Sequence, residues 1–278
     1  MNWTKQTAGW LLGLALTFST CSPNNVTVDE SLKTHFDKQN TTGTFALFDN
    51  SLGQFTIYAL PKYKDSAYTP ASTFKIVNSL IGLETGVIEN EKMVIRWDGV
   101  VRTGPAGDTM HAWNKDLTME EAFKASAVPY YQEVARRIGR DTMQRWLDSL
   151  KYGNHVIGKE IDQFWLDGSL KVRPDEQLGL VKRLYFGELP FQKRTQEIVR
   201  NVMLQEANSN YKLAYKTGWA NPGTDQQKGW ILGWIEENKH PYFFVLLVEA
   251  KAGTDMQTVR KQILMDILKQ LGFLEGKR

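Results

Sequence analysis

Residues 70–84 read PASTFKIVNSLIGLE, and this stretch decides how the rest of the chain is interpreted. Its pattern predicts a helix from Ser72 to about Glu84, with Gly86 placed to end it. Apolar side chains occupy nearly every side of this helix, and a helix that is apolar all round is buried. We therefore expect this segment to lie inside the protein.

A polar stripe follows one edge of this helix. Ser72, Lys75 and Ser79 fall at positions i, i+3 and i+7, with Ser72 at the positive N-terminal end. Burial disfavours a charged ammonium, which suits Lys75 to act as the base that activates Ser72 as a nucleophile. The alternative is a serine N-cap followed by a lysine that extends to solvent. The apolar neighbours of Lys75 leave little room for that arrangement.

Strand patterns occur near both ends of the chain. The first two would form a hairpin with which the mature chain starts, and the others follow residue 208. The expected strands cover residues 44–48, 54–58, 211–217, 230–236 and 242–250.

The middle of the chain predicts helices. Two helices would begin at capping boxes, at residues 118–121 and 141–144, and Gly139 would end the helix before the second box. Further helices would begin at Pro174 and Arg194, and a last helix at the capping box of residues 254–257. Strands at both ends around a helical middle imply an α/β (α+β) fold. We expect an antiparallel sheet flanked by helices from both chain ends, with an inserted all-helical subdomain.

The domain expectations follow from this order of elements. One catalytic domain would cover residues 22–278, with its α/β part at about 22–90 and 208–278 and its helical part at about 91–207. The cleft between the two parts is the expected site.

Two other segments place polar side chains where elements end. Ser126 lies in the break between the helix begun at Thr118 and one that Pro129 opens, where it either faces a cleft or caps the second helix. Residues 216–218 read Lys-Thr-Gly at the end of a strand. Lys-Thr suits recognition of a carboxylate, and glycine lets a substrate approach the backbone closely. The alternative is an ordinary exposed strand end.

The motifs form an ordered set. They are PASTFK at 70–75, SAV at 126–128, YGN at 152–154, QFWL at 163–166 and KTG at 216–218. Each is weak alone, but together they resemble the class D (oxacillinase-type) serine β-lactamases over nearly all of the chain after its N-terminal segment. The resemblance implies a β-lactamase/transpeptidase-like fold. It also implies hydrolysis of the β-lactam ring of penicillin-type antibiotics through a serine acyl-enzyme, which confers antibiotic resistance.

The resemblance also implies catalytic roles. Lys75 would be carboxylated by carbon dioxide, with no other cofactor, and the carbamate would be the general base, steadied by the indole N–H of Trp165. Trp165 is alternatively a core residue alone. Ser126 would relay a proton to the β-lactam nitrogen, with Lys216 nearby.

Substrate-binding roles follow from the same resemblance. Backbone N–H groups of Ser72 and Trp219 would form the oxyanion hole. Val128 and Leu166 would cover the modified lysine. Arg260 would hold the substrate carboxylate, although an arginine early in a last helix is ordinarily a surface residue. The full set of expected substrate-binding residues is Thr217, Gly218, Arg260, Val128 and Leu166.

The N-terminus reads as an export signal. Lys5 precedes an apolar run over residues 8–18, which is too short to cross a bilayer but has the length of a signal-peptide core. Cys21, the single cysteine, follows at once and suits lipid attachment after cleavage, while ordinary signal-peptidase processing is the alternative. We expect residues 1–21 to direct export to the periplasm, with a membrane anchor if Cys21 is lipidated.

Composition and spacing exclude other classes. A net charge of +3 with scattered Lys and Arg gives no support for nucleic-acid binding, and four distant histidines with one cysteine predict no metal site. The partner expected is a small β-lactam, and the oligomeric state stays open. Two other functions remain alternatives: a β-lactam sensor domain that stays acylated, and a cell-wall transpeptidase or carboxypeptidase.

Overall fold

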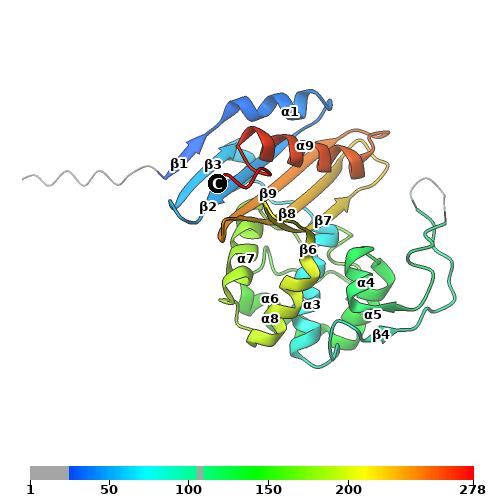
Figure 1. Ribbon diagram of the computed structural model, residues 1–278. Coiled ribbons are helices and arrows are strands. Elements are labelled where there is room, and N and C mark those ends of the chain that lie inside the picture. Colours follow the sequence, from blue (N-terminus) through cyan, green and yellow to red (C-terminus); the bar gives the residue numbers. More distant parts are fainter. Residues whose placement is uncertain (1–24, 105–108) are drawn as a thin grey trace, which may run out of the picture.

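The computed structural model describes residues 25–104 and 109–278, and a seven-stranded sheet forms its centre (Figure 1). The strand order is β1-β3-β2-β9-β8-β7-β6, and every neighbouring pair is antiparallel except β1 and β3. The strands are β1 (Val26–Val28), β2 (Thr42–Asp49), β3 (Gln54–Tyr58), β6 (Leu204–Ala207), β7 (Lys212–Ala220), β8 (Gln227–Glu237) and β9 (His240–Ala250). A separate small ladder joins β4 (Val94–Ile95) to β5 (Leu117–Thr118).

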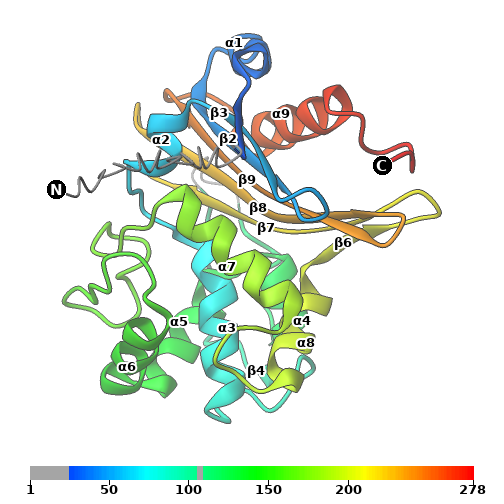
Figure 2. The same cartoon turned by 90° about the vertical axis from the view of Figure 1, so that its left-hand side faces the viewer.

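Helices cover both faces of the sheet. Figure 2 shows α1 and α9 on one face and the other long helices on the opposite face. The helices are α1 (Lys33–Asp37), α2 (Leu60–Lys64), α3 (Lys75–Glu84), α4 (Met119–Lys124), α5 (Val128–Ile138), α6 (Arg140–Leu150), α7 (Pro174–Phe186), α8 (Lys193–Met203) and α9 (Met256–Gln270). The fold is therefore the expected α/β (α+β) arrangement, in which segments from both chain ends build one sheet.

Two apolar cores lie on the two faces of the sheet. The smaller one joins α1 and α9 to the sheet, and the larger one surrounds α3. Every residue of α3 from Lys75 to Gly82 is buried, which confirms the burial predicted from its apolar pattern. Helix α3 packs against α5 and α8, so its first turn is held inside the protein.

Short-range sequence patterns account for several helix ends and turns of the structure. Thr118 forms a capping box with Glu121, and Gly139 ends α5 with a φ of 76°. The β8–β9 turn consists of Asn238 and Lys239, both with positive φ, as a two-residue hairpin turn requires.

Other expectations about element boundaries were wrong. The predicted hairpin of β2 and β3 is preceded by β1 and α1, which are too short to show a periodic pattern. Asp141 lies in the first turn of α6 and does not cap it, because Gly139 is the N-cap residue. The last helix is capped by Asp255, whose side chain accepts from the Thr258 N–H, and not by Thr254.

The expectations for residues 1–21, including Cys21, lie outside the residues that the structure describes. No helix within residues 25–104 or 109–278 combines the length and the apolar character needed to cross a bilayer.

Candidate active site

Ser72 and Lys75 lie together at the start of the buried helix. Ser72 belongs to a 3-10 turn (Ala71–Phe74), so the regular helix begins at Lys75 and not at Ser72 as its pattern predicted. The Lys75 Nζ donates a hydrogen bond to the Ser72 Oγ at 2.7 Å. Lys75 is fully buried, which excludes the alternative of a lysine extending to solvent. Burial lowers the pKa of Lys75 to about 7, so the amine is available as a proton acceptor near neutral pH.

The turn that carries Ser72 is held by contacts distant in sequence. Ala71 has a φ of 49°, which is uncommon for a residue with a side chain, and its N–H donates to the Trp165 carbonyl at 3.0 Å. Just before the turn, Tyr68 exchanges two backbone hydrogen bonds of 2.9 Å with Val172. The segment containing Trp165 therefore fixes the position of Ser72.

A buried chain of side-chain hydrogen bonds also supports the turn that carries Ser72. The Tyr152 hydroxyl donates to the Gln177 Oε1 at 3.1 Å, and the Gln177 Nε2 donates to the Thr73 hydroxyl at 2.8 Å. The Thr73 hydroxyl in turn donates to the Pro70 carbonyl at 2.7 Å. Gln177 was not predicted from the sequence, since a glutamine inside a helix carries no motif.

Trp165 packs beside the start of α3. Its indole stacks on the ring of Phe74, with the ring centroids 5.3 Å apart, and the residue is fully buried. The indole Nε1 has no hydrogen-bond partner among the described residues. Trp165 is therefore a core residue, but an unpaired buried donor of this kind calls for a partner that it can bind.

Ser126 and Lys216 form a second pair across the cleft. Ser126 lies in the break between α4 and α5 with a φ of 56°, and its Oγ accepts from the Lys216 Nζ at 2.9 Å. The N-cap residue of α5 is Ala127, so the capping interpretation of Ser126 is wrong. Burial lowers the pKa of Lys216 well below its ordinary value, and repulsion by Lys75 and Arg260 lowers it further.

Arg260 extends from α9 to β7 and is not a surface residue. It is 8% exposed, and its Nη1 donates to the Gly218 carbonyl at 2.5 Å. Burial lowers its pKa to about 10. Gly218 itself packs closely: a Cβ there would lie 2.8 Å from the Pro70 carbonyl oxygen, so glycine lets β7 approach the turn that carries Ser72.

A cleft of about 620 Å³ joins these groups. Lys75, Trp165 and Lys216 are buried and are not among its lining residues, although both lysines bond to serines that line it. Ser79, at the far end of the polar stripe, bonds to the Tyr131 hydroxyl. The predicted residues that line the cleft are Ser72, Ser126, Val128, Leu166, Thr217, Gly218, Trp219 and Arg260. Lining residues that the sequence did not indicate include Met110, Trp113, Lys124 and Gln257.

Comparisons with known proteins agree with this geometry. Residues 33–269 match the family model described as penicillin binding protein transpeptidase domain. The chain is 36% identical to β-lactamase OXA-5 of Pseudomonas aeruginosa, over 95% of this chain and 97% of the relative. The class D β-lactamase YbXI from Nostoc is 36% identical with a TM-score of 0.81, covering 88% of this chain and 100% of that structure. The C-terminal domain of the Bacillus licheniformis penicillin receptor BlaR is 29% identical with a TM-score of 0.82, covering 89% and 97%.

Replacing Lys75 by methionine should stabilise the fold while ending catalysis. The folded pKa is about 7 against an ordinary 10.5, so between these values the unfolded chain holds a proton that the folded chain does not. The resulting penalty is absent above pH 10.5 and grows as the pH falls to 7. We expect Lys75→Met to raise the free energy of unfolding by about 4 kcal/mol near pH 7.5, measured by urea unfolding in carbon-dioxide-depleted buffer.

The gain should shrink as the pH rises and fall to near zero above about pH 11, where both states of the wild type are mostly neutral at this position. Lys269→Met, which changes an exposed lysine of α9, is the control and should alter stability little at either pH. A gain from Lys75→Met that does not vary with pH would contradict a neutral buried amine.

Proposed function

The chain belongs to the class D β-lactamase family, whose members hydrolyse β-lactams, and from this premise we propose that Ser72 performs the hydrolysis of penicillin-type antibiotics through an acyl-enzyme. Hydrolysis of this kind confers resistance to the antibiotic. One observation carries the assignment of the nucleophile: the buried Lys75 amine, with its lowered pKa, lies 2.7 Å from the Ser72 hydroxyl at the wall of the cleft.

Acylation needs one proton acceptor and one proton donor. The Ser72 Oγ attacks the β-lactam carbonyl carbon while its proton passes to the base at Lys75. The ring C–N bond then breaks, and the nitrogen takes a proton from the Ser126 hydroxyl. Lys216, whose Nζ lies 2.9 Å from that hydroxyl, passes a proton back to Ser126, and the proton that the base at Lys75 took from Ser72 makes up the balance, so acylation consumes no net proton.

Charge on the substrate is held by groups around the cleft. We assign the oxyanion hole to the backbone N–H groups of Ser72 and Trp219. The Nη1 of Arg260 donates to the Gly218 carbonyl, so its other nitrogens remain available to bind the substrate carboxylate. The Thr217 hydroxyl would bind the same carboxylate. Gly218 keeps the strand backbone accessible beside them.

The surroundings of Lys75 fit a carbamate formed with carbon dioxide. A neutral amine is the form that reacts, and the pKa of about 7 supplies it. The unpaired Trp165 Nε1 is a donor in the same core and would hold a carbamate oxygen. When formed, the carbamate supplies a general base for both acylation and deacylation. Val128 and Leu166, both half-buried in the cleft wall, limit the access of water to this region.

The sensor is the strongest alternative, since BlaR shares the fold at 29% identity. The higher identity to enzymes, 36% to OXA-5, favours turnover. Both classes are acylated at serine, and only deacylation separates them.

Mutation of the nucleophile tests the central assignment. Ser72→Ala should reduce nitrocefin hydrolysis to background, because it removes the oxygen that forms the bond to the substrate. Intact-protein mass spectrometry should show a penicillin adduct on the wild type alone, with repeated turnover of nitrocefin per enzyme. Residual hydrolysis by Ser72→Ala would contradict the assignment, and one turnover per wild-type molecule would identify a sensor.

Removal of the indole donor tests the role of Trp165. Trp165→Phe keeps a ring on Phe74 but deletes the N–H, so the carbamate signal of labelled bicarbonate in NMR should weaken. Deacylation should slow at least about tenfold and more than acylation, with partial rescue by added bicarbonate. Trp146→Phe changes a similar stack, on Phe191, and is the control.

A role for Trp165 in packing alone gives a different result. Acylation and deacylation would then fall equally, in proportion to the loss in thermal stability, without rescue by bicarbonate. Stopped-flow rates and a melt on each variant decide between the two.

We also propose export, with residues 1–21 as the signal and lipid on Cys21. The apolar run of residues 8–18 and the cysteine that follows it support this assignment. Wild-type protein expressed in bacteria should label with a palmitate analogue and sediment with membranes, and Cys21→Ser should be unlabelled and soluble in the periplasm. Unlabelled wild-type protein in the soluble fraction would reject lipidation.

A further inference from the structure

A second hollow lies beside the catalytic cleft and takes no part in the proposed reaction. Its volume is about 430 Å³, within the range of small-molecule sites. It is lined by residues 94–98, by Trp113, Lys115 and Leu117, and by the outer face of α5. Trp113 lines both this hollow and the catalytic cleft, and its Nε1 donates to the Ala125 carbonyl at 2.9 Å, which fixes the indole between them.

The walls of the hollow are apolar and aromatic. Ile95, Leu117 and Tyr130 are buried in them, and Trp97 lies at the margin with 37% exposure. The Trp97 Nε1 donates to the Val100 carbonyl at 3.0 Å, so this indole is also fixed. Four of the nine exposed large hydrophobic residues of the described chain fall within residues 94–101, which makes this segment its most apolar exposed stretch. Such a patch marks a site of contact with a ligand or partner.

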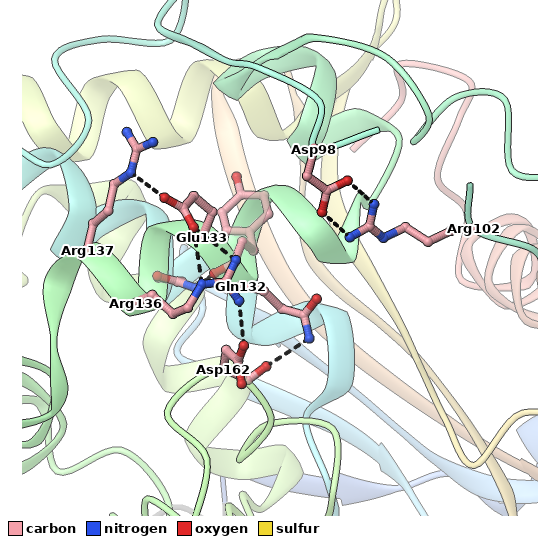
Figure 3. A network of polar contacts seen from close by, with 9 residues as sticks. Asp98, Arg102, Gln132, Glu133, Arg136, Arg137 and Asp162 are labelled. Atoms are coloured by element: carbon pink, nitrogen blue, oxygen red, sulfur yellow. Dashed lines mark hydrogen bonds and ion pairs between the residues drawn. The ribbon is translucent and has the colours of Figure 1, made fainter. Parts of the chain in front are cut away.

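The rim of the hollow carries an excess of positive charge. Arg96, Lys115, Arg136 and Arg137 line it, against two carboxylates, Asp98 and Glu133. Both carboxylates are already neutralised (Figure 3).

Figure 3 shows how each carboxylate is occupied. Arg102 grips both oxygens of Asp98 at 2.6 Å, and Glu133 accepts from Arg136 at 2.9 Å and from Arg137 at 2.8 Å. Arg136 also bonds to Asp162 at 2.5 Å. Asp98 and Glu133 are therefore already paired with arginine side chains, which fix their positions.

Donors on the rim remain free. Arg96 forms no ion pair or hydrogen bond with any residue of the described ranges, and Arg137 uses its Nε alone, which leaves both terminal nitrogens. Lys115 has a loose pair with Glu121 at 3.6 Å. An anion at the mouth would thus find guanidinium groups with unused N–H donors.

We propose that this hollow binds an amphiphilic anion, a molecule with a flat aromatic body and one carboxylate or sulfonate group. The body packs between the indoles of Trp97 and Trp113 over the apolar floor, and the anion lies against Arg96 and Arg137. A second protein copy is a poorer match, because the hollow is a concave site of small-molecule size.

The test uses two dyes that differ in charge. Anilinonaphthalene sulfonate fluoresces when it enters an apolar site, and phenylnaphthylamine has the same ring system without the sulfonate. In titrations of the wild type, the sulfonate should bind more tightly, with one site per chain and weaker binding at high salt.

Charge reversal on the rim locates the site. Arg96→Glu should weaken binding of the sulfonate at least about tenfold and leave the neutral dye nearly unchanged. Arg145→Glu reverses an exposed arginine of α6 outside the hollow and should change neither. Both variants should keep wild-type nitrocefin turnover, which shows that they are folded.

Two results would overturn the proposal. Equal weakening by Arg96→Glu and Arg145→Glu would mean that the dye responds to overall charge. Competitive inhibition of nitrocefin hydrolysis at the dye's own dissociation constant, unaffected by Arg96→Glu, would place the dye in the catalytic cleft.

Discussion

Three basic side chains are buried around one cleft, and no carboxylate within residues 25–104 or 109–278 forms an ion pair with any of them. The chemistry of the site depends on this constraint. Lys75, Lys216 and Arg260 hydrogen-bond to neutral oxygens, namely the hydroxyls of Ser72 and Ser126 and the Gly218 carbonyl. Burial of uncompensated cations costs free energy, and the protein meets this cost by lowering the pKa of each group. Arg260, whose pKa of about 10 keeps it charged near neutral pH, makes the cleft favourable for an anion. Catalytic competence and affinity for a carboxylate thus have one physical origin.

The apolar core around α3 is what maintains this state. A lysine at the first turn of an exposed helix would extend to water and keep its charge. Here residues 75–82 of α3 are all buried in the large core, and Phe74, which precedes Lys75 in the chain, stacks on Trp165. The core therefore sets the protonation of the site as well as the stability of the fold.

Much of the fold and of the catalytic set could be predicted from the sequence because its causes are local. The burial of α3 follows from its apolar pattern, and the Thr118 cap from side-chain to backbone bonds three residues apart. The 3-10 turn at Ser72 could not be predicted, since it depends on a hydrogen bond from Ala71 to Trp165, far away in sequence. The location of Arg260 likewise depends on how α9 packs across β8, which no local pattern records.

The bond between Ala71 and the Trp165 carbonyl also limits how the chain can be engineered. The loop from Leu150 to Pro174 is bound to residues 68–71 by backbone hydrogen bonds at two points. One is the bond from Ala71 to Trp165, and the other is the Tyr68–Val172 pair. Loops on protein surfaces ordinarily accept exchange between relatives, but this one shares its backbone hydrogen bonds with the segment before α3. A chimaera that takes the loop from another family member must therefore take residues 68–73 with it, so the two segments form one unit of recombination.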